Sequence, residues 1–205
     1  MKSERVIAYI DGFSLYFGLK DADWRRYYWL DPRALCLRLL RDSQQLVQVK
    51  YFTSRIKGFP GKLKRQSTYF EALSTIPDVQ LIYGKYQFKP YQCRTCGYLN
   101  QVPEGKMTDV QMAVEMLVDA LHDNYDTALL ITGDIDIAPS IEKTRQAFAD
   151  KRVLVAFPPR RNTQELRKAA SAYLHITEPI LRSSLLPEQV AAPGGYVLRR
   201  PSEWT

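Results

Sequence analysis

The sequence predicts an α/β fold built on a doubly wound, mainly parallel sheet. Five short apolar runs, rich in residues that favour strands, alternate with segments of helical periodicity, which is typical of this class. The length of 205 residues suits one such domain with a tail. A hydrophobic fraction of 45% beside 25% charged residues is typical of water-soluble globular proteins. We therefore expect a single packed sheet flanked by helices.

Each predicted element has its own local signal. The apolar runs that predict strands are residues 6–10, 46–53, 79–83, 128–132 and 153–157. Asp31 followed by Pro32 is typical of a helix start, and Ser14 is expected to cap a helix after the first strand. Periodicity and caps predict helices over residues 31–41, 62–74, 107–123, 139–148 and 163–170.

Composition bounds the organisation and the partners. Residues 1–183 are expected to form the domain, and residues 184–205, which gain Pro and Gly, a tail that is either extended or docked. The net charge of +7 favours an anionic partner. No apolar run is long enough to cross a bilayer, and the first residues enter a strand without a signal-peptide pattern, so we expect no membrane partner and a cytoplasmic location.

Aspartates follow two of the predicted strands, and another aspartate belongs to a helix. Asp11 ends the first strand and Asp134 follows the fourth, so both are expected at the same edge of the sheet. On a helical projection Asp109 falls in the apolar arc of its helix and faces the sheet, whereas Asp119 falls in the opposite, polar arc. Carboxylates that converge repel one another, and hard divalent cations relieve this repulsion. With Asp136, these residues predict a Mg²⁺ or Mn²⁺ site.

Simpler interpretations of these aspartates stay open. Asp134 could cap the next helix while Asp136 is solvated, and Asp11 could stabilise its own turn. Asp109 could act as a first-turn partner of the helix dipole. The convergence of three separate segments on one edge favours the metal site.

Three segments carry a resemblance to a known family. "YIDGFSLYFGL", "GKMTDVQMAVEMLVDA" and "YDTALLITGDIDIAPSIE" resemble the signature segments of the NYN domain, a PIN-like nuclease family, in its bacterial LabA-like branch. The spacers "WRRYYWLD", "KRQSTYFEAL" and "CRTCG" also resemble that branch, so the similarity covers residues from about 5 to 180. The resemblance implies a PIN-like three-layer α/β/α sandwich around a mainly parallel sheet, here expected with five strands. It also implies a Mg²⁺- or Mn²⁺-dependent ribonuclease site at Asp11, Asp109, Asp134 and Asp136. The chain departs from the family pattern in having Ser14 in place of Asn and Ile135 in place of Ser.

Basic residues follow the second and fifth predicted strands, next to the expected metal site. Together with Ser14, we expect them to contact nucleic acid; they are Arg55, Lys57, Lys62, Arg65, Arg160 and Arg161. Phe59 and Tyr69 could stack on bases. A solvated helix face is the alternative for Lys62 and Arg65. The aromatic segment "WRRYYWLD" is expected to form an apolar cap or a dimer contact, with base stacking as the second interpretation.

The "CRTCG" motif places Cys93 and Cys96 at the spacing of half a zinc ribbon. The sequence offers only Cys36, His122 and His175 as further ligands of this kind. We therefore do not expect structural zinc within one chain, and the motif is read as a free-thiol turn or as a site shared across a homodimer.

Together these observations predict a metal-dependent nuclease, with an endoribonuclease favoured and RNA preferred over DNA as partner. Water activation is assigned to the metal because the three motifs contain no histidine. The alternative is a catalytically weak or inactive protein of the same fold that binds RNA or DNA or acts as a scaffold. A phosphotransferase of the haloacid dehalogenase type is disfavoured because its paired aspartates would follow the first strand.

Overall fold

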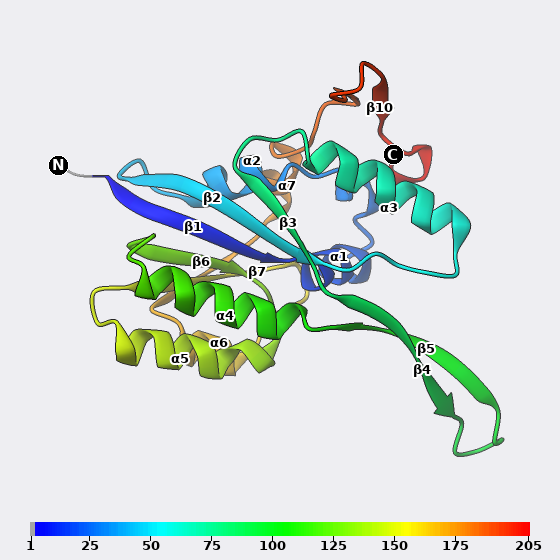
Figure 1. The fold of residues 1–205 in the computed structure, drawn as a ribbon, viewed down its shortest axis with the longest axis horizontal. Helices are drawn as coiled ribbons and strands as arrows, with labels where there is room; N and C mark the ends of the chain where they lie inside the picture. Colours follow the sequence, from blue (N-terminus) through cyan, green and yellow to red (C-terminus); the bar gives the residue numbers. More distant parts are fainter. Residues whose placement is uncertain (1–2) are drawn as a thin grey trace.

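The chain forms a three-layer α/β/α sandwich. A computed structural model describes residues 3–205, and for residues 100–106 it describes the backbone. The central sheet has six strands in the order β3-β2-β1-β6-β7-β8, and every neighbouring pair in it is parallel (Figure 1). The predicted fold class is confirmed, with one strand more than the five expected.

Five strands of the sheet match the apolar runs closely, and the sixth has no apolar run. The strands are β1 (Glu4–Asp11), β2 (Gln44–Thr53), β3 (Val79–Tyr83), β6 (Thr127–Ile131), β7 (Arg152–Phe157) and β8 (Ala172–His175). All five residues of β6 are buried, whereas all four residues of β8 are exposed. An exposed edge strand lacks the apolar signature, which explains why β8 was not predicted.

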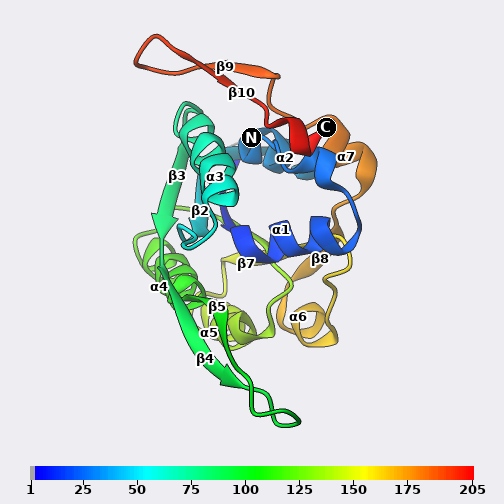
Figure 2. The same cartoon turned by 90° about the vertical axis from the view of Figure 1, so that its right-hand side faces the viewer.

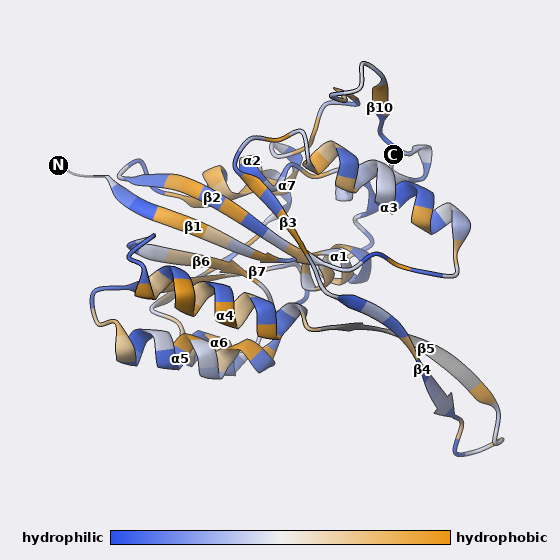
Figure 3. Cartoon of the chain, viewed as in Figure 1, coloured by the Kyte–Doolittle hydropathy of each residue, from blue (hydrophilic) through white to orange (hydrophobic). Residues whose placement is uncertain are grey.

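Helices cover both faces of the sheet (Figure 2). One face packs against α1 (Gly12–Asp21), α2 (Pro32–Leu39), α3 (Pro60–Leu73) and α7 (Glu178–Arg182), and the other against α4 (Thr108–Leu121), α5 (Ala138–Ala147) and α6 (Gln164–Ala169). Figure 3 shows apolar residues concentrated along the central strands. Among residues 3–205, no helix combines the length and the apolar composition needed to cross a membrane.

Two hairpins lie outside the main sheet. Strands β4 (Lys85–Gln92) and β5 (Leu99–Lys106) pair antiparallel over eight residue pairs and project from the body as an arm (Figures 1 and 2). Strands β9 (Gln189–Ala191) and β10 (Val197–Arg199) form the second hairpin, within the expected tail. Short 3₁₀ turns complete the chain as η1 (Arg25–Tyr27), η2 (Ile135–Ile137) and η3 (Ser202–Trp204).

The segment 184–205 is docked rather than extended. The Trp29 indole N–H donates to the Pro187 carbonyl at 2.8 Å, and the Asp31 N–H donates to the Ser184 carbonyl at 2.8 Å. Leu186 and Leu198 belong to the same apolar cluster as Trp29, which is fully buried. The boundary at residue 183 stays a prediction, because the segment beyond it shares the core of the rest.

A buried ionic network fastens α4 to the sheet. Lys50 on β2 donates from Nζ to Asp119 at 2.6 Å and to Glu115 at 2.7 Å. The hydroxyl of Tyr9, which pairs with Lys50 across the sheet, donates to Asp119 at 2.6 Å, and Asn124 donates to it at 3.0 Å. Burial alone would raise the pKa of Asp119, but the hydrogen bonds from Lys50, Tyr9 and Asn124 outweigh it and lower the pKa.

This network corrects one position in the predicted faces of α4. Met112, Met116 and Ala120 are buried against the sheet, but Asp119, expected on the polar arc, is also buried, at 5% exposed. A helical projection considers one helix alone, so it could not include Tyr9 on β1 and Lys50 on β2, the hydrogen-bond partners that allow Asp119 to be buried. Asp109 nevertheless faces the sheet edge, as shown below.

A second ion pair joins the starts of β1 and β6. The Asp126 carboxylate accepts from the Arg5 backbone N–H at 2.7 Å and from its guanidinium at 2.7 and 3.2 Å. These hydrogen bonds lower the pKa of Asp126 to about 2.

Replacing Asp126 with Asn should therefore change the acid dependence of stability. A carboxyl group whose pKa is lower in the folded state stabilises the fold above its unfolded value of about 3.9, and this contribution disappears as the pH falls through the folded value. The free energy of unfolding of D126N should fall below that of wild type at neutral pH, and the difference should close near about pH 2. Urea unfolding at both pH values measures this, and an equal difference at both would contradict the assignment.

Candidate metal centre and nucleic-acid interface

Asp11 is held at the end of β1 by hydrogen bonds from two segments. Its Oδ1 accepts from the N–H groups of Phe13 and Ser14, both at 3.0 Å, so that Asp11 caps α1. Its Oδ2 accepts from the Thr132 hydroxyl at 3.1 Å. The expectation that Ser14 caps this helix was wrong, because the carboxylate of Asp11 already reaches the free N–H groups of the first turn.

The loop after β6 is fixed by the same residues. Thr132 Oγ1, which donates to Asp11, also accepts from the Asp134 N–H at 3.0 Å. The Ser14 hydroxyl oxygen accepts from the Gly133 N–H at 2.8 Å. A Cβ on Gly133 would lie 2.6 Å from Arg161 Cβ, so this position requires glycine for the loop to pack there. Thr132 thus sets the spacing of Asp11 and Asp134, a role that the sequence analysis missed.

Asp109 reaches the site from the first turn of α4. The helix begins after Met107, whose backbone is left-handed with φ 77°, a conformation that non-glycine residues rarely adopt. Such strain is found where the surrounding structure requires a particular chain direction. Here the turn leads out of the β4–β5 arm and brings Asp109 over the edge of the sheet.

The three aspartates meet where the strand order of the sheet reverses. β1 and β6 are neighbours, with β2 and β3 on one side and β7 and β8 on the other, and ligands of open parallel sheets bind at this point. Asp11, Asp109 and Asp134 each contribute one carboxylate oxygen to a group in which all the atoms lie within 4.8 Å of one another. The convergence predicted from the sequence is therefore present.

The charges in this cluster repel one another. Burial raises the pKa of Asp11 to about 6, and the charges of Asp109 and Asp134 add to the effect, while the hydrogen bond from Ser14 opposes it. Burial and the charges of Asp134 and Asp136 likewise raise the pKa of Asp109. Anionic oxygens at this spacing, drawn from three segments and mutually destabilised, fit a hard divalent cation such as Mg²⁺ or Mn²⁺.

Asp136 lies beside the cluster, outside the group of three. Its N–H donates to Asp134 Oδ1 at 3.0 Å within η2, and its side chain is exposed. Its charge contributes to the raised pKa of Asp109. The neighbouring Ile135 is 49% exposed and faces the same cavity as the cluster.

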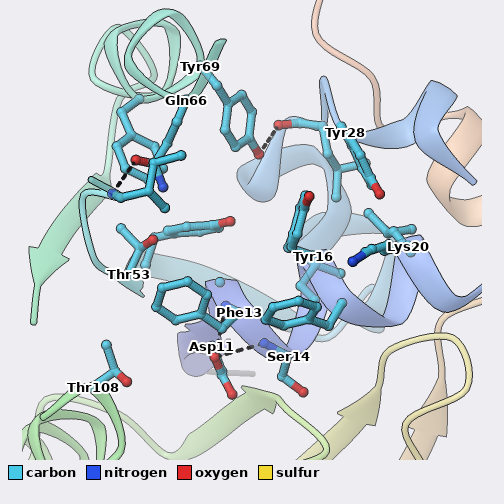
Figure 4. Close-up of a pocket in the computed structure, with 18 of the residues that line it drawn as sticks. Asp11, Phe13, Ser14, Tyr16, Lys20, Tyr28, Thr53, Gln66, Tyr69 and Thr108 are labelled. Carbon is cyan, nitrogen blue, oxygen red and sulfur yellow. Dashed lines mark hydrogen bonds between the residues drawn. The ribbon is translucent and has the colours of Figure 1, made fainter. Parts of the chain in front are cut away.

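A cavity of about 970 Å³ is lined by the three aspartates. Figure 4 shows Asp11 in this cavity together with Tyr16, Tyr28 and Tyr69. Its wall is rich in aromatic rings from α1, α3, the 24–30 segment and the tail, among them Phe13, Tyr16, Tyr28, Phe59, Tyr69 and Trp204. The rings of Tyr16 and Tyr28 are 4.9 Å apart, and those of Tyr28 and Trp204 are 5.7 Å apart. The cavity is therefore lined by the three aspartates on one side and by aromatic rings on the other walls.

The "WRRYYWLD" segment forms part of the core rather than a surface patch. Trp29 is fully buried, Tyr27 is 2% exposed and Tyr28 is 9% exposed. Tyr27 and Tyr28 also face the cavity. The segment therefore packs into the core of its own chain, instead of presenting an apolar surface to a partner.

Three of the predicted basic residues line the cavity together with the carboxylates: Lys62, Arg65 and Arg161. Two of these form ion pairs, because Arg65 contacts Glu203 at 2.6 Å and Arg161 contacts Asp21. Lys20 and Arg25 also line the cavity and were missed. Lys20 belongs to α1, the helix that directly follows Asp11. Its place on this helix could have indicated from the sequence that Lys20 lies near the site.

The remaining predicted contacts lie around the cavity. Arg55 and Lys57 line a smaller hollow at the base of the β4–β5 arm, where the Arg55 guanidinium lies 5.0 Å from the Tyr83 ring centre. Gln66 holds this loop by accepting from the Ile56 N–H at 2.9 Å and donating to the Ser54 carbonyl at 3.1 Å. Arg160 is exposed, with a left-handed backbone, and belongs to neither hollow among the described residues.

Comparison with known proteins identifies the family. A family model described as "NYN domain" matches residues 5–178, which is most of the chain. The chain belongs to the NYN domain family. The family indicates a PIN-like, nuclease-type hydrolase that acts on nucleic acid, and the acidic cluster of this NYN chain is compatible with the divalent metal that PIN-like nucleases use.

Two individual proteins are similar to this NYN chain. One is "6-hydroxy-3-succinoylpyridine 3-monooxygenase HspA" of Pseudomonas putida, 26% identical over 98% of this chain and 75% of its own length. The other is the crystal structure of a protein of unknown function, VPA0982 from Vibrio parahaemolyticus, with a TM-score of 0.61, 20% identity, and coverage of 90% of this chain and 98% of that one. The second similarity shows a shared fold.

Proposed function

We propose that this NYN protein is a divalent-metal-dependent endoribonuclease acting on single-stranded RNA. The observation that carries the proposal is the meeting of Asp11, Asp109 and Asp134 within 4.8 Å at the carboxyl edge of the sheet. These residues are proposed to hold Mg²⁺ or Mn²⁺. When bound, such an ion neutralises the scissile phosphate and supplies a water of lowered pKa.

The side chains around the cluster have separate roles in this proposal. Thr132 keeps Asp11 and Asp134 in register, and Asp136, exposed beside Asp109, orients the attacking water or accepts its proton. Lys62, Arg65 and Arg161 hold the phosphates that flank the scissile bond. Lys62 and Arg65 lie on α3 and Arg161 lies in the loop between β7 and α6. A single RNA strand that contacts both elements would cross the cavity next to the carboxylates.

The aromatic wall supports a single-stranded substrate. Unpaired bases expose their faces, and stacking on aromatic side chains contributes about 1–3 kcal/mol per base. Tyr16 and Phe59, 40% and 44% exposed, are available for such stacking next to the cluster. A base-paired duplex would hide these faces, so we expect it to be cleaved poorly.

Cleavage assays test the proposal. Purified protein is incubated with labelled single-stranded RNA, single-stranded DNA and duplex RNA, each with Mg²⁺, with Mn²⁺ or with EDTA. Internal cuts in single-stranded RNA that need a divalent ion and disappear in Asp134→Asn support it. If no condition gives cleavage while salt-sensitive binding persists, the chain is a binding protein of the same fold. Ser14 and Ile135, the two departures from the family pattern, motivate this alternative.

The cavity wall favours one further candidate, a small aromatic substrate. The Pseudomonas putida relative is named for action on a substituted pyridine. The ring-lined cavity, which includes Trp204, could accept a planar heterocycle as well as a base. Titration with 6-hydroxy-3-succinoylpyridine, followed by tryptophan fluorescence, tests this candidate; saturable binding that RNA does not displace would favour it over the nuclease.

Charge changes at the cavity should alter RNA affinity in opposite directions. Lys62→Ala removes a phosphate contact, so the slope of log affinity against log salt should flatten by about 0.7 for single-stranded RNA. Glu203→Gln frees Arg65 from its 2.6 Å ion pair and should tighten binding. Fluorescence anisotropy in an Asp134→Asn background measures both without cleavage, with the exposed Lys168→Ala on α6 as control. Equal affinities for the Lys62 and Lys168 variants would place the RNA elsewhere.

A further inference from the structure

The β4–β5 arm ends in a turn that carries both cysteines of the "CRTCG" motif, with Cys96 exposed and Cys93 half-buried. Each strand of the arm has eight residues, so the arm extends by about 27 Å at 3.4 Å per residue. Both views show it leaving the body of the molecule (Figures 1 and 2). An isolated two-stranded hairpin is marginally stable in water, so a defined tip calls for an additional stabilising element.

The two cysteines lie in one tight, hydrogen-bonded turn. The Cys93 N–H donates to the Tyr98 carbonyl and the Gly97 N–H donates to the Cys93 carbonyl, both at 2.9 Å. Gly97 adopts a left-handed backbone with φ 71°, which folds the chain back directly after Cys96. Both thiols therefore belong to one tight turn at the outer end of the arm.

The spacing of the two thiols suits a metal site. Cys93 and Cys96 are separated by two residues, as are the paired cysteines of structural zinc sites. A thiolate is the form that binds metal, and Zn²⁺ in structural sites takes four ligands in a tetrahedral arrangement.

The chain itself does not supply two more ligands of this kind at the tip. The sequence has one other cysteine, Cys36, which is fully buried in the core on α2, and two histidines, His122 and His175. His122 follows the far end of α4 and His175 ends β8, both in the body of the molecule. The two thiols at the tip therefore supply two of the four ligands that a closed zinc site needs.

We propose that the arm tips of two copies of this chain bind one Zn²⁺ between them, with Cys93 and Cys96 of each copy as the four ligands. A two-fold axis through the ion makes the contact self-complementary, as in most homodimers. Tyr91, Tyr98 and Leu99 beside the thiols are 54%, 67% and 68% exposed, so tip-to-tip contact would bury apolar surface. Binding converts four thiols to thiolates and releases four protons, with no change of oxidation state. This inference is independent of the proposed nuclease activity.

The test uses the full chain, purified under reducing conditions, with Zn²⁺ alone as the probe. Metal analysis should give one zinc for every two chains, and light scattering after size exclusion should give a dimer. Strong chelation should halve the mass. Cys93→Ser and Cys96→Ser should each lose the zinc and the dimer, while Arg94→Ala, in the same turn, should keep both. The spectrum of the Co²⁺-substituted protein should show four-thiolate coordination.

Four results would overturn the proposal: one zinc held by a monomer, a dimer that survives chelation or either cysteine variant, reduced thiols that bind no zinc, or a Cys93–Cys96 disulfide in place of the metal. Because the tip is outside the two apolar core clusters, the serine variants should keep, in the absence of zinc, the circular dichroism spectrum and the melting temperature of metal-free wild type. A loss of folding in either variant would likewise contradict the placement of the tip outside the core.

Discussion

Replacing Asp134 with Asn is expected to reduce metal-dependent RNA cleavage by more than about 100-fold. Loss of a residue that merely supports a metal ligand costs about 10–100-fold, so loss of a ligand should cost more. Asp11→Asn should have a similar effect, because the two carboxylates belong to one group with Asp109. Initial cleavage rates at saturating Mg²⁺ or Mn²⁺ measure the loss.

These variants should fold normally. An Asn side chain keeps the oxygen that accepts from the Asp136 N–H in Asp134→Asn, or from the Phe13 and Ser14 N–H groups in Asp11→Asn. In Asp134→Asn, removing the negative charge also relieves part of the effect that, after burial, raises the pKa of Asp109. In EDTA the melting temperature should therefore equal or exceed that of wild type.

Metal binding gives a second readout that does not depend on activity. A cation that binds the folded state stabilises it by an amount that grows with its concentration. Mg²⁺ or Mn²⁺ should raise the melting temperature of wild type and of Glu142→Gln, an exposed position on α5, but not of Asp134→Asn or Asp11→Asn. Cleavage within tenfold of wild type in both aspartate variants, or an unchanged metal-induced shift, would refute the site.

Replacing Lys50 with Met is expected to lower the free energy of unfolding by about 3–5 kcal/mol, because it leaves a buried charge without its partner. The side chains of Lys50 and Asp119 are each 7% exposed, and Asp119 receives hydrogen bonds from Lys50, Tyr9 and Asn124. Burial alone would lower the pKa of Lys50, but its bonds to Asp119 and Glu115 raise it instead. Urea unfolding measures the loss.

A double replacement separates the charge from the packing. Lys50→Met with Asp119→Leu removes both charges, so it should recover much of the loss seen in the single variant. The exposed Lys143→Met on α5 should change stability by less than about 0.5 kcal/mol. A single Lys50 variant as stable as this control would mean that the network does not hold α4.

The same network connects the core to the site. Lys50 and Tyr9 hold the middle of α4, and Asp109 lies in the first turn of that helix. Loosening α4 should therefore weaken the metal-induced rise in melting temperature even where the protein remains folded.

The parts of the structure that the sequence predicted best are those with a strong local signal. Strand β3 has the predicted bounds, and β1, β2, β6 and β7 differ by two residues or fewer at each end. Fully buried parallel strands read as apolar runs, which local pattern identifies. The exposed β8 and the arm strands lack such runs, so they were missed.

The residues of the candidate site also fall into two groups, those that the sequence predicted and those that it did not. Asp11 and Asp134 follow two strands, so the rule for parallel sheets places them at one edge, and family resemblance names the same residues. Thr132, Lys20 and Trp204 were missed because their roles depend on neighbours distant in the chain. The tail illustrates this: its Trp204 reaches a cavity that is also lined by residues of α1 and α3.

The sequence by itself determined the α/β class, the family and the three aspartates that meet, because strand periodicity and strand-end position are local properties. Only the tertiary structure decided that Asp119 is buried against Lys50, that Arg65 is paired with Glu203, and that the cavity has an aromatic wall. The physical reason is that a charged or aromatic side chain takes its role from the partners that folding brings to it, and these partners are distant in the chain: Lys50 and Asp119 are 69 residues apart, and Arg65 and Glu203 are 138 apart.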